Sequence, residues 1–162
     1  MLTGVDHMSW GVFSARACTA VAAIAAVTSC AFAAERVTKE EAVAMVRKAI
    51  EAIKSEGADK AYVEIDDQSG PFVDRELYIV VCGPDGTILA DGANKARIGT
   101  NRIDAQDPDG KAFIKERVEL AKEHASFWQS YKYLNPLTKN IEQKQMYCER
   151  LDTTTVCGGI YD

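Results

Sequence analysis

The sequence predicts an α+β domain in which one antiparallel sheet of about five strands is covered on both faces. Two segments place apolar residues at helical spacing, and five shorter segments are rich in apolar and β-branched residues with turn signals between them. The last two strand segments are separated by only two residues, a connection that antiparallel neighbours permit. We expect the long N-terminal helix to pack on one face of the sheet, and a layer of loop and helix to cover the other.

The first 33 residues have the features of an export signal. Arg16 is the only Lys or Arg before Arg36, and it precedes the uncharged apolar run ACTAVAAIAAV. Ala31 and Ala33 then form an A-x-A site of the kind that signal peptidase cleaves. We therefore predict a signal peptide over residues 1–33 and a single periplasmic domain over residues 34–162.

Three alternatives for this N-terminal segment stay open. Met8 is a second candidate start besides Met1. Cys30, in the sequence VTSC, is a candidate lipidated first residue of a lipoprotein. An uncleaved membrane anchor is the third alternative, since residues 17–34 carry no charge, although this run is barely long enough to span a bilayer.

The charge of the chain limits its partners. The formal net charge is -5, and it is unchanged without residues 1–33, which contain Asp6 and Arg16. A mildly acidic chain with no basic run is not expected to bind nucleic acid or an anionic membrane surface.

The first predicted element of the domain is a long amphipathic helix between Thr38 and Gly57. Thr38 and Glu41 form a capping-box pattern, and Gly57 is a typical helix end. Apolar residues recur on one face of this helix: Val43, Val46, Ile50 and Ile53. A shorter and weaker helix is expected over residues 58–67, before the turn sequence SGP.

A hairpin and a long loop are predicted next. Residues 76–82, ELYIVVC, are apolar at consecutive positions, which is typical of a central strand covered on both faces. GPDG supplies the turn, and residues 87–90, TILA, return as the partner strand. Residues 92–110 lack periodicity and contain glycine, proline, Asn and Asp, which indicates a loop with a functional role.

A second helix and three strands complete the domain. The helix is expected over residues 109–125, and one side of it is apolar: Phe113, Ile114, Val118 and Ala121. The strands are predicted at residues 127–133, 142–151 and 154–161. Asp152 and Thr153 form a tight turn between the last two strands.

Three aspartates precede the second helix: Asp104, Asp107 and Asp109. Their spacing differs from that of an EF-hand loop, and no glutamate follows at the required offset. We expect Asp109 to cap the helix and Asp107 to shape the turn. The sequence predicts no metal site and no cofactor.

Five segments in this order resemble the single Cache family of extracytoplasmic sensor modules, whose core is similar to the PAS fold. They are DRELYIVVCGPDGTILADG, IGTNRIDAQDPDGKAF, FWQSYKYLNP, EQKQMY and CGGIY, and they lie within residues 74–161. The resemblance implies a PAS-like sheet that binds a small ligand, often a short carboxylate or an amino acid, on its loop-covered face. The chain departs from the family pattern at Tyr133, where a tryptophan is common.

The expected function is small-ligand binding and sensing, not catalysis. The chain has no C-x-x-C motif, and His124 is the only histidine after residue 33, so the sequence does not assemble a nucleophile, a base and an orienting group. A second function class stays open, a non-catalytic accessory protein that docks on a membrane-bound receptor or transporter. It is suggested by the end of the sequence at Asp162, where no signalling domain follows.

Lys144 and two tyrosines are the main candidates for ligand binding. Lys144, within the strand segment IEQKQMY, has an ammonium group that suits a ligand carboxylate. Tyr131 and Tyr133 are two residues apart, so they share one face of their strand and offer hydroxyl groups. Arg97, in the long loop, is expected to close over the ligand. For each of these residues a structural or solvated role is the alternative.

Trp128 and Tyr147 complete the candidate site with less direct support. Trp128 points to the opposite face of its strand from Tyr131, so a place in the core is its alternative. Tyr147 is three residues from Lys144, and both can line one cavity only if a bulge intervenes.

The cysteines predict one disulfide. Cys148 and Cys157 flank the predicted turn symmetrically, which places them opposite each other on neighbouring strands, close to the separation that a disulfide needs. Cys82, at the end of a central strand, is expected to be a buried free thiol. Pairing of Cys82 with Cys157 is the alternative.

Overall fold

The computed structural model describes residues 36–162. The predicted signal peptide and the alternatives for Met8 and Cys30 lie outside these residues. Helices and strands follow one another in this order: α1 (Lys39–Glu56), α2 (Ala58–Ile65), β1 (Val73–Asp74), β2 (Leu77–Cys82), β3 (Ile88–Asp91), the 3-10 helix η1 (Lys95–Arg97), α3 (Phe113–Glu123), β4 (Ser126–Leu134), β5 (Ile141–Leu151) and β6 (Thr154–Tyr161). None of the helices within residues 36–162 is both long and apolar enough to cross a membrane.

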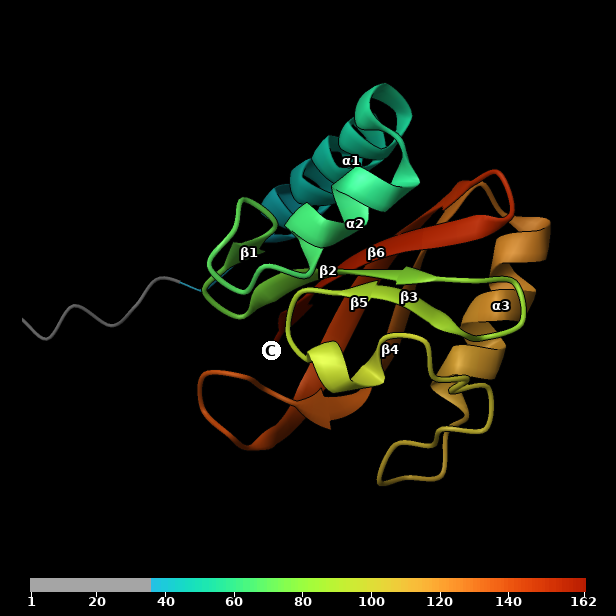
Figure 1. Cartoon of the computed structure of the whole chain (residues 1–162). Helices are drawn as coiled ribbons and strands as arrows, with labels where there is room; N and C mark the ends of the chain where they lie inside the picture. Colours follow the sequence, from blue (N-terminus) through green and yellow to red (C-terminus); the bar gives the residue numbers. More distant parts are fainter. Residues whose placement is uncertain (1–35) are drawn as a thin grey trace, which may run out of the picture. The chain divides into compact units, whose positions relative to one another are not determined.

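The strands form one antiparallel sheet of six strands in the order β1-β2-β6-β5-β4, and β3 also pairs with β2 (Figure 1). The α+β class is confirmed. β2 lies inside the sheet and is buried at every position, as its continuous apolar run predicted. β1 was not predicted, because a strand of two residues is too short to show a pattern.

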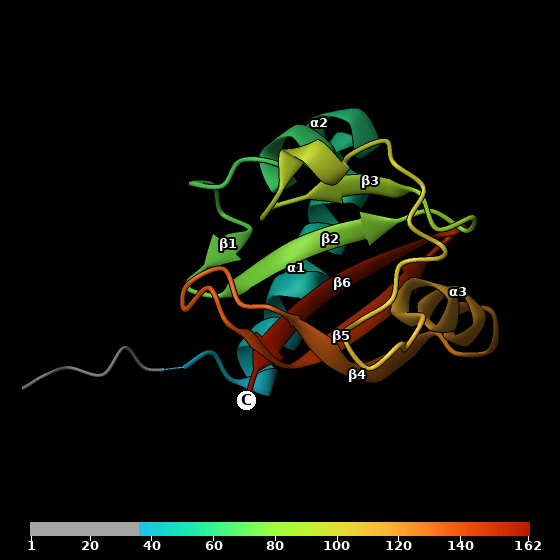
Figure 2. The same ribbon diagram turned by 90° about the horizontal axis from the view of Figure 1, so that it is seen from below.

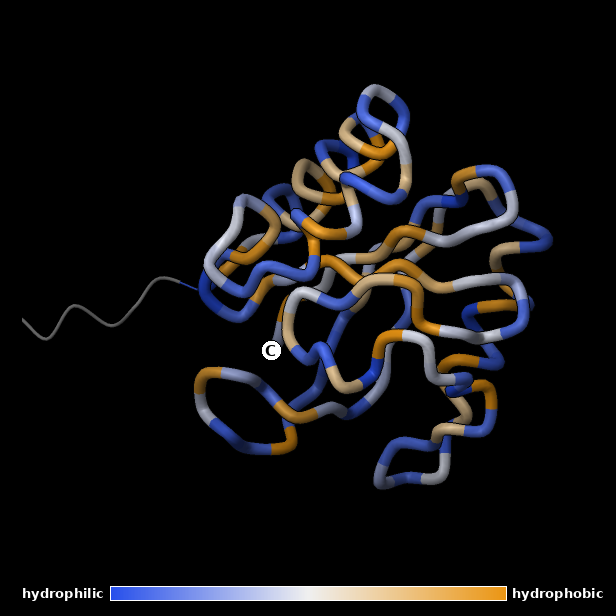
Figure 3. Tube along the Cα trace, viewed as in Figure 1, coloured by the Kyte–Doolittle hydropathy of each residue, from blue (hydrophilic) through white to orange (hydrophobic). Residues whose placement is uncertain are grey.

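Helix α1 covers one face of the sheet. Thr38 caps it through the predicted capping box: its side chain accepts from the backbone N–H of Glu41, whose carboxylate accepts from the backbone N–H of Thr38. Apolar and hydrophilic residues alternate along the helix (Figure 3), and its apolar stripe packs on alternate residues of the strands. The buried residues of this first core include Val46, Ala49, Ile50, Ile79, Val81 and Val156.

The other face of the sheet is covered by α3 and the loop that precedes it (Figure 2). Asp107 shapes this loop as predicted, because its carboxylate accepts from the backbone N–H groups of Asp109, Lys111 and Lys132. The prediction that Asp109 caps α3 was wrong. The turn closed by Asp107 delays the helix to Phe113, and Asp109 instead forms an ion pair with Lys132 at 2.9 Å.

The predicted disulfide between Cys148 and Cys157 is confirmed. The two residues lie directly opposite each other on β5 and β6, because the turn at Asp152 and Thr153 pairs Leu151 with Thr154. Cys82 is a free, buried thiol.

Removal of this disulfide is expected to lower the free energy of unfolding by about 2 to 3 kcal/mol, because the loop that it closes is short. The measurement is chemical denaturation of a Cys148→Ala/Cys157→Ala protein next to the parent. A Cys82→Ala protein, which keeps the bond, serves as the control for losing buried sulfur. Equal stability of the double variant and the parent would contradict the expectation.

Candidate functional site

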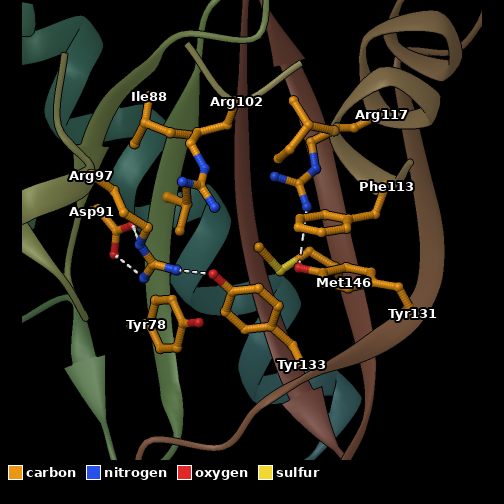
Figure 4. Close-up of a pocket in the computed structure, with 12 residues that line it drawn as sticks. Tyr78, Ile88, Asp91, Arg97, Arg102, Phe113, Arg117, Tyr131, Tyr133 and Met146 are labelled. Carbon is orange, nitrogen blue, oxygen red and sulfur yellow. Dashed lines mark hydrogen bonds and ion pairs between the residues drawn. The ribbon is translucent and has the colours of Figure 1, made fainter. Parts of the chain in front are cut away.

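A small pocket with both apolar and charged lining residues lies between the sheet and the layer formed by η1, the loop and α3 (Figure 4). Its charged lining groups are Asp91, Arg97, Arg102 and Arg117. Its phenolic groups are Tyr78, Tyr131 and Tyr133. The free volume is about 30 Å³, room for about one water molecule. The pocket therefore brings an excess of positive charge into a nearly filled space.

Arg117 is the most unusual of these residues. It lies on α3 between Ile114 and Val118, on the apolar side of the helix, and is only 1% exposed. Its Nη2 donates to the Tyr131 hydroxyl at 3.2 Å, and its Nε donates to Oε1 of Gln129 at 3.3 Å. Within residues 36–162 no carboxylate forms an ion pair with it. A buried charge with only neutral partners is costly, so this position favours an anion as partner.

Gln129 positions Arg117 from β4. Its side-chain amide donates to the backbone carbonyl of Phe113 at 2.7 Å and to Glu116 at 2.5 Å, which leaves its oxygen directed at Arg117. Gln129 is itself 4% exposed. The side chain of Gln129 therefore ties β4 to the first turn of α3 and fixes the direction of the Arg117 guanidinium.

Arg97 and Arg102 approach the pocket from the loop side. Arg97 forms an ion pair with Asp91, with Nε 2.8 Å from Oδ2, and donates from Nη1 to the Tyr133 hydroxyl. Burial is the largest single effect and lowers the pKa of Arg97, but the carboxylate of Asp91 together with the phenols of Tyr133 and Tyr78 outweighs it, and the net pKa is raised. The guanidinium of Arg102 points into the pocket (Figure 4), and no described carboxylate pairs with it.

Tyr131 and Tyr133 lie on the same face of β4, as their spacing predicted. The Tyr131 ring stacks on Phe113 at 4.4 Å and meets the Tyr133 ring edge-on at 5.8 Å. Burial raises the pKa of Tyr131, and Arg117 offsets only part of this rise. Tyr131 is therefore a neutral hydrogen-bonding group near neutral pH.

Lys144 lies on the same face of the sheet but beneath the pocket, and it is fully buried. Its Nζ is 3.2 Å from the Tyr161 hydroxyl and 3.9 Å from the centre of the Tyr78 ring. Gly159 makes room for it, because a Cβ there would lie 2.7 Å from Cε of Lys144. Burial, followed by the charges of Arg97 and Arg117, holds the pKa of Lys144 well below its usual value.

Trp128 and Tyr147 lie on the opposite face of the sheet, beside α1, and do not line the pocket. Their rings are 5.2 Å apart, and Tyr147 belongs to the core beneath α1. The pairing of β4 with β5 runs without a bulge from Ser126 to Leu134, so Tyr147 stays on the face opposite Lys144. These two residues are therefore not brought together with the other candidates.

Sequence reasoning missed Arg117, Arg102 and Asp91. A usable signal existed for Arg117, which follows Phe113 by four residues and so falls within the apolar stripe of the second helix. A cation at such a position is either paired or functional. Arg102 and Asp91 carry no comparable signal, because their directions depend on how the loop folds onto the sheet.

The family model described as single Cache domain 2 matches residues 9–158. The chain belongs to this family. The predicted resemblance is thereby confirmed, and the Cache domain is a small-ligand sensor module with a PAS-like core. A search of curated proteins found no match.

Three solved structures are similar to this Cache domain. A methyl-accepting chemotaxis protein from Vibrio parahaemolyticus has 19% identity and a TM-score of 0.66, over 76% of this chain and 87% of that one. A Cache chemosensory domain, described with its basis for carboxylic acid recognition, has 19% identity and a TM-score of 0.64, over 75% and 91%. A periplasmic sensor domain of a chemotaxis protein has 18% identity and a TM-score of 0.60, over 75% and 88%. At these identities the likeness concerns the fold.

Proposed function

We propose that this Cache domain is a periplasmic sensing module that binds a small anion, a short carboxylate or an amino acid, in the pocket between the sheet and α3. The observation that carries the proposal is the buried guanidinium of Arg117, which has hydrogen bonds to Gln129 and Tyr131 but no ion pair with a described carboxylate. The similar Cache domain described for carboxylic acid recognition supports the same ligand class.

The chemistry of the lining suits a carboxylate. The planar guanidinium of Arg117 presents parallel N–H donors that match the two oxygens of a carboxylate. Arg102 enters from the loop side, so that an anion between the two is held by charge from both directions. The hydroxyl groups of Tyr131 and Tyr133 offer neutral donors at the sheet. Arginines and phenols placed in this way support binding, not a chemical step.

The ligand reaches this site through a second, outer pocket. This outer pocket has a volume of about 350 Å³ and shares Tyr78, Arg97, Arg102 and Tyr133 with the inner one. Because the inner pocket has room for about one water molecule, an organic acid must displace the side chains of Arg97 or Tyr133 to enter. The hydrogen bond between these two side chains is the contact that opens.

A thermal-shift screen of the exported domain tests the proposal. Short organic acids and amino acids are compared with the primary amides of the same acids, which have the same shape but no charge. An acid that binds is expected to stabilise the fold by about 2.7 kcal/mol at a concentration of 100 Kd. The proposal fails if no anion raises the melting temperature, or if each amide raises it as much as its acid.

The alternative function, an accessory protein that docks on a membrane-bound receptor or transporter, makes a different prediction for the same material. If this alternative holds, no small anion raises the melting temperature, and a membrane protein co-purifies with the domain from detergent extracts.

A further inference from the structure

We propose that anion binding in this pocket is coupled to the uptake of one proton by Lys144. The inference rests on the proposed function and concerns the regulation of the same site. Lys144 thereby acts as a proton acceptor beneath the ligand instead of a direct contact to it.

The first step is the environment of the Lys144 amine. Titratable and charged groups face it from each neighbouring element: Tyr78 of β2, Asp91 of β3, Arg97 of η1, Arg117 of α3, Tyr131 and Tyr133 of β4, Glu142 of its own strand and Tyr161 of β6. The two carboxylates have other partners. Asp91 pairs with Arg97, and Glu142 accepts hydrogen bonds from Asn135 and Thr138. No described carboxylate therefore forms an ion pair with the amine.

The second step concerns the groups that oppose protonation of the Lys144 amine when no anion is bound. Lys144 is fully buried, and its pKa is held down by burial, with further contributions from the positive charges of Arg97 and Arg117. The neighbouring phenols do not compete for a proton, because burial raises the pKa of Tyr78, Tyr131 and Tyr161 and keeps them protonated. Among the groups around the pocket, Lys144 is thus the buried amine whose protonation is opposed by burial and by the surrounding positive charges.

The third step is the effect of the ligand. An anion beside Arg117 and Arg102 offsets the positive charges that disfavour the ammonium form, so the pKa of Lys144 rises on binding. Binding then takes up a proton, and affinity increases as pH falls between the bound and free pKa values. Outside this window the affinity is flat. A carboxylic acid with a pKa of about 4 is ionised throughout the neutral range and adds no dependence of its own.

Isothermal titration calorimetry with propionate measures the coupling directly. At each pH from 7 to 8.5, the binding heat is recorded in triethanolamine and in Tris, two cationic buffers whose ionisation enthalpies differ, and the difference gives the number of protons taken up. We expect the parent to take up as much as one proton at the pH of maximum coupling, and its Kd to rise by up to tenfold per pH unit there. A Lys144→Met protein is expected to bind propionate without proton uptake.

A Lys115→Gln protein is the matched control, since Lys115 is exposed on α3 and carries the same charge. It should keep the full uptake. The inference is overturned if the parent binds propionate with no proton uptake at any pH, or if Lys144→Met takes up as many protons as the parent. If the Lys144→Met protein does not fold, the proton uptake measured for the parent alone still tests the inference. Absence of propionate binding by the parent, with no other acid active in the thermal-shift screen, counts against the proposed function itself.

Discussion

Replacing Arg117 with glutamine is expected to weaken the binding of propionate by about 30-fold to several thousand-fold. Removing one partner of a buried, hydrogen-bonded charge pair costs about 2 to 5 kcal/mol, and each 1.4 kcal/mol corresponds to a factor of ten in Kd. Most of this loss arises because the ligand carboxylate would enter a buried site without its paired cation. The measurement is the Kd of propionate at pH 7 by calorimetry.

The control for this variant is Lys115→Gln, which removes the same charge from an exposed position of the same helix. Equal Kd values of propionate for the two variants would show that Arg117 does not bind the ligand. In the absence of anion, the Arg117→Gln protein is expected to be at least as stable as the parent, because it no longer buries an unpaired guanidinium. Loss of binding without loss of stability would separate a functional role from a structural one.

Replacing Gly159 with valine is expected to lower the free energy of unfolding by about 3 kcal/mol. A Cβ at this position would lie 2.7 Å from Cε of Lys144, 2.7 Å from Sδ of Met146 and 2.9 Å from the backbone oxygen of Gln145. The side chains have some freedom to move, but the backbone oxygen is held in the pairing of β5 with β6. Overpacking of this kind costs about 1 to 3 kcal/mol, and valine lies at the upper end because it adds three carbons.

A double-mutant cycle with the smaller substitution Gly159→Ala tests whether Lys144 is a side chain that an added Cβ meets. The substitution Gly159→Ala is made in the parent and in a Lys144→Ala protein, and the four unfolding free energies are measured by urea denaturation. Recovery of about 1 kcal/mol in the Lys144→Ala background is expected for residues in direct contact. An identical loss in both backgrounds would show that Lys144 does not occupy the space above Gly159.

Local sequence patterns predicted most of the fold. Thr38 and Glu41 defined the start of α1, and the two-residue turn after Leu151 set the register that joins Cys148 to Cys157. Both features depend on residues close together in the chain. The start of α3 was mispredicted because Asp107, not Asp109, organises the turn, and the choice between two nearby aspartates depends on the distant backbone N–H of Lys132.

Less of the candidate site than of the fold could be predicted from the sequence. The alternation of side chains along a strand placed Tyr131 and Tyr133 together and placed Trp128 on the other face, and the structure has this arrangement. Arg117 was missed because a pattern that counts only apolar residues passes over a cation among them. Arg102 belongs to a loop without periodicity, and only the folded loop determines where its guanidinium points.

The pocket draws its chemical groups from two parts of the domain, the sheet and the layer that covers it. The phenols and the amine come from strands, and a covalent bond between β5 and β6 fixes their register. The guanidinium groups come from η1, the loop and α3. Backbone hydrogen bonds tie the loop to the hairpin of β2 and β3, whereas the side chain of Gln129 ties α3 to β4. The proposed anion between Arg117 and Arg102 would therefore be a counter-ion shared by α3 and the loop, two segments that contact the same sheet through separate hydrogen bonds.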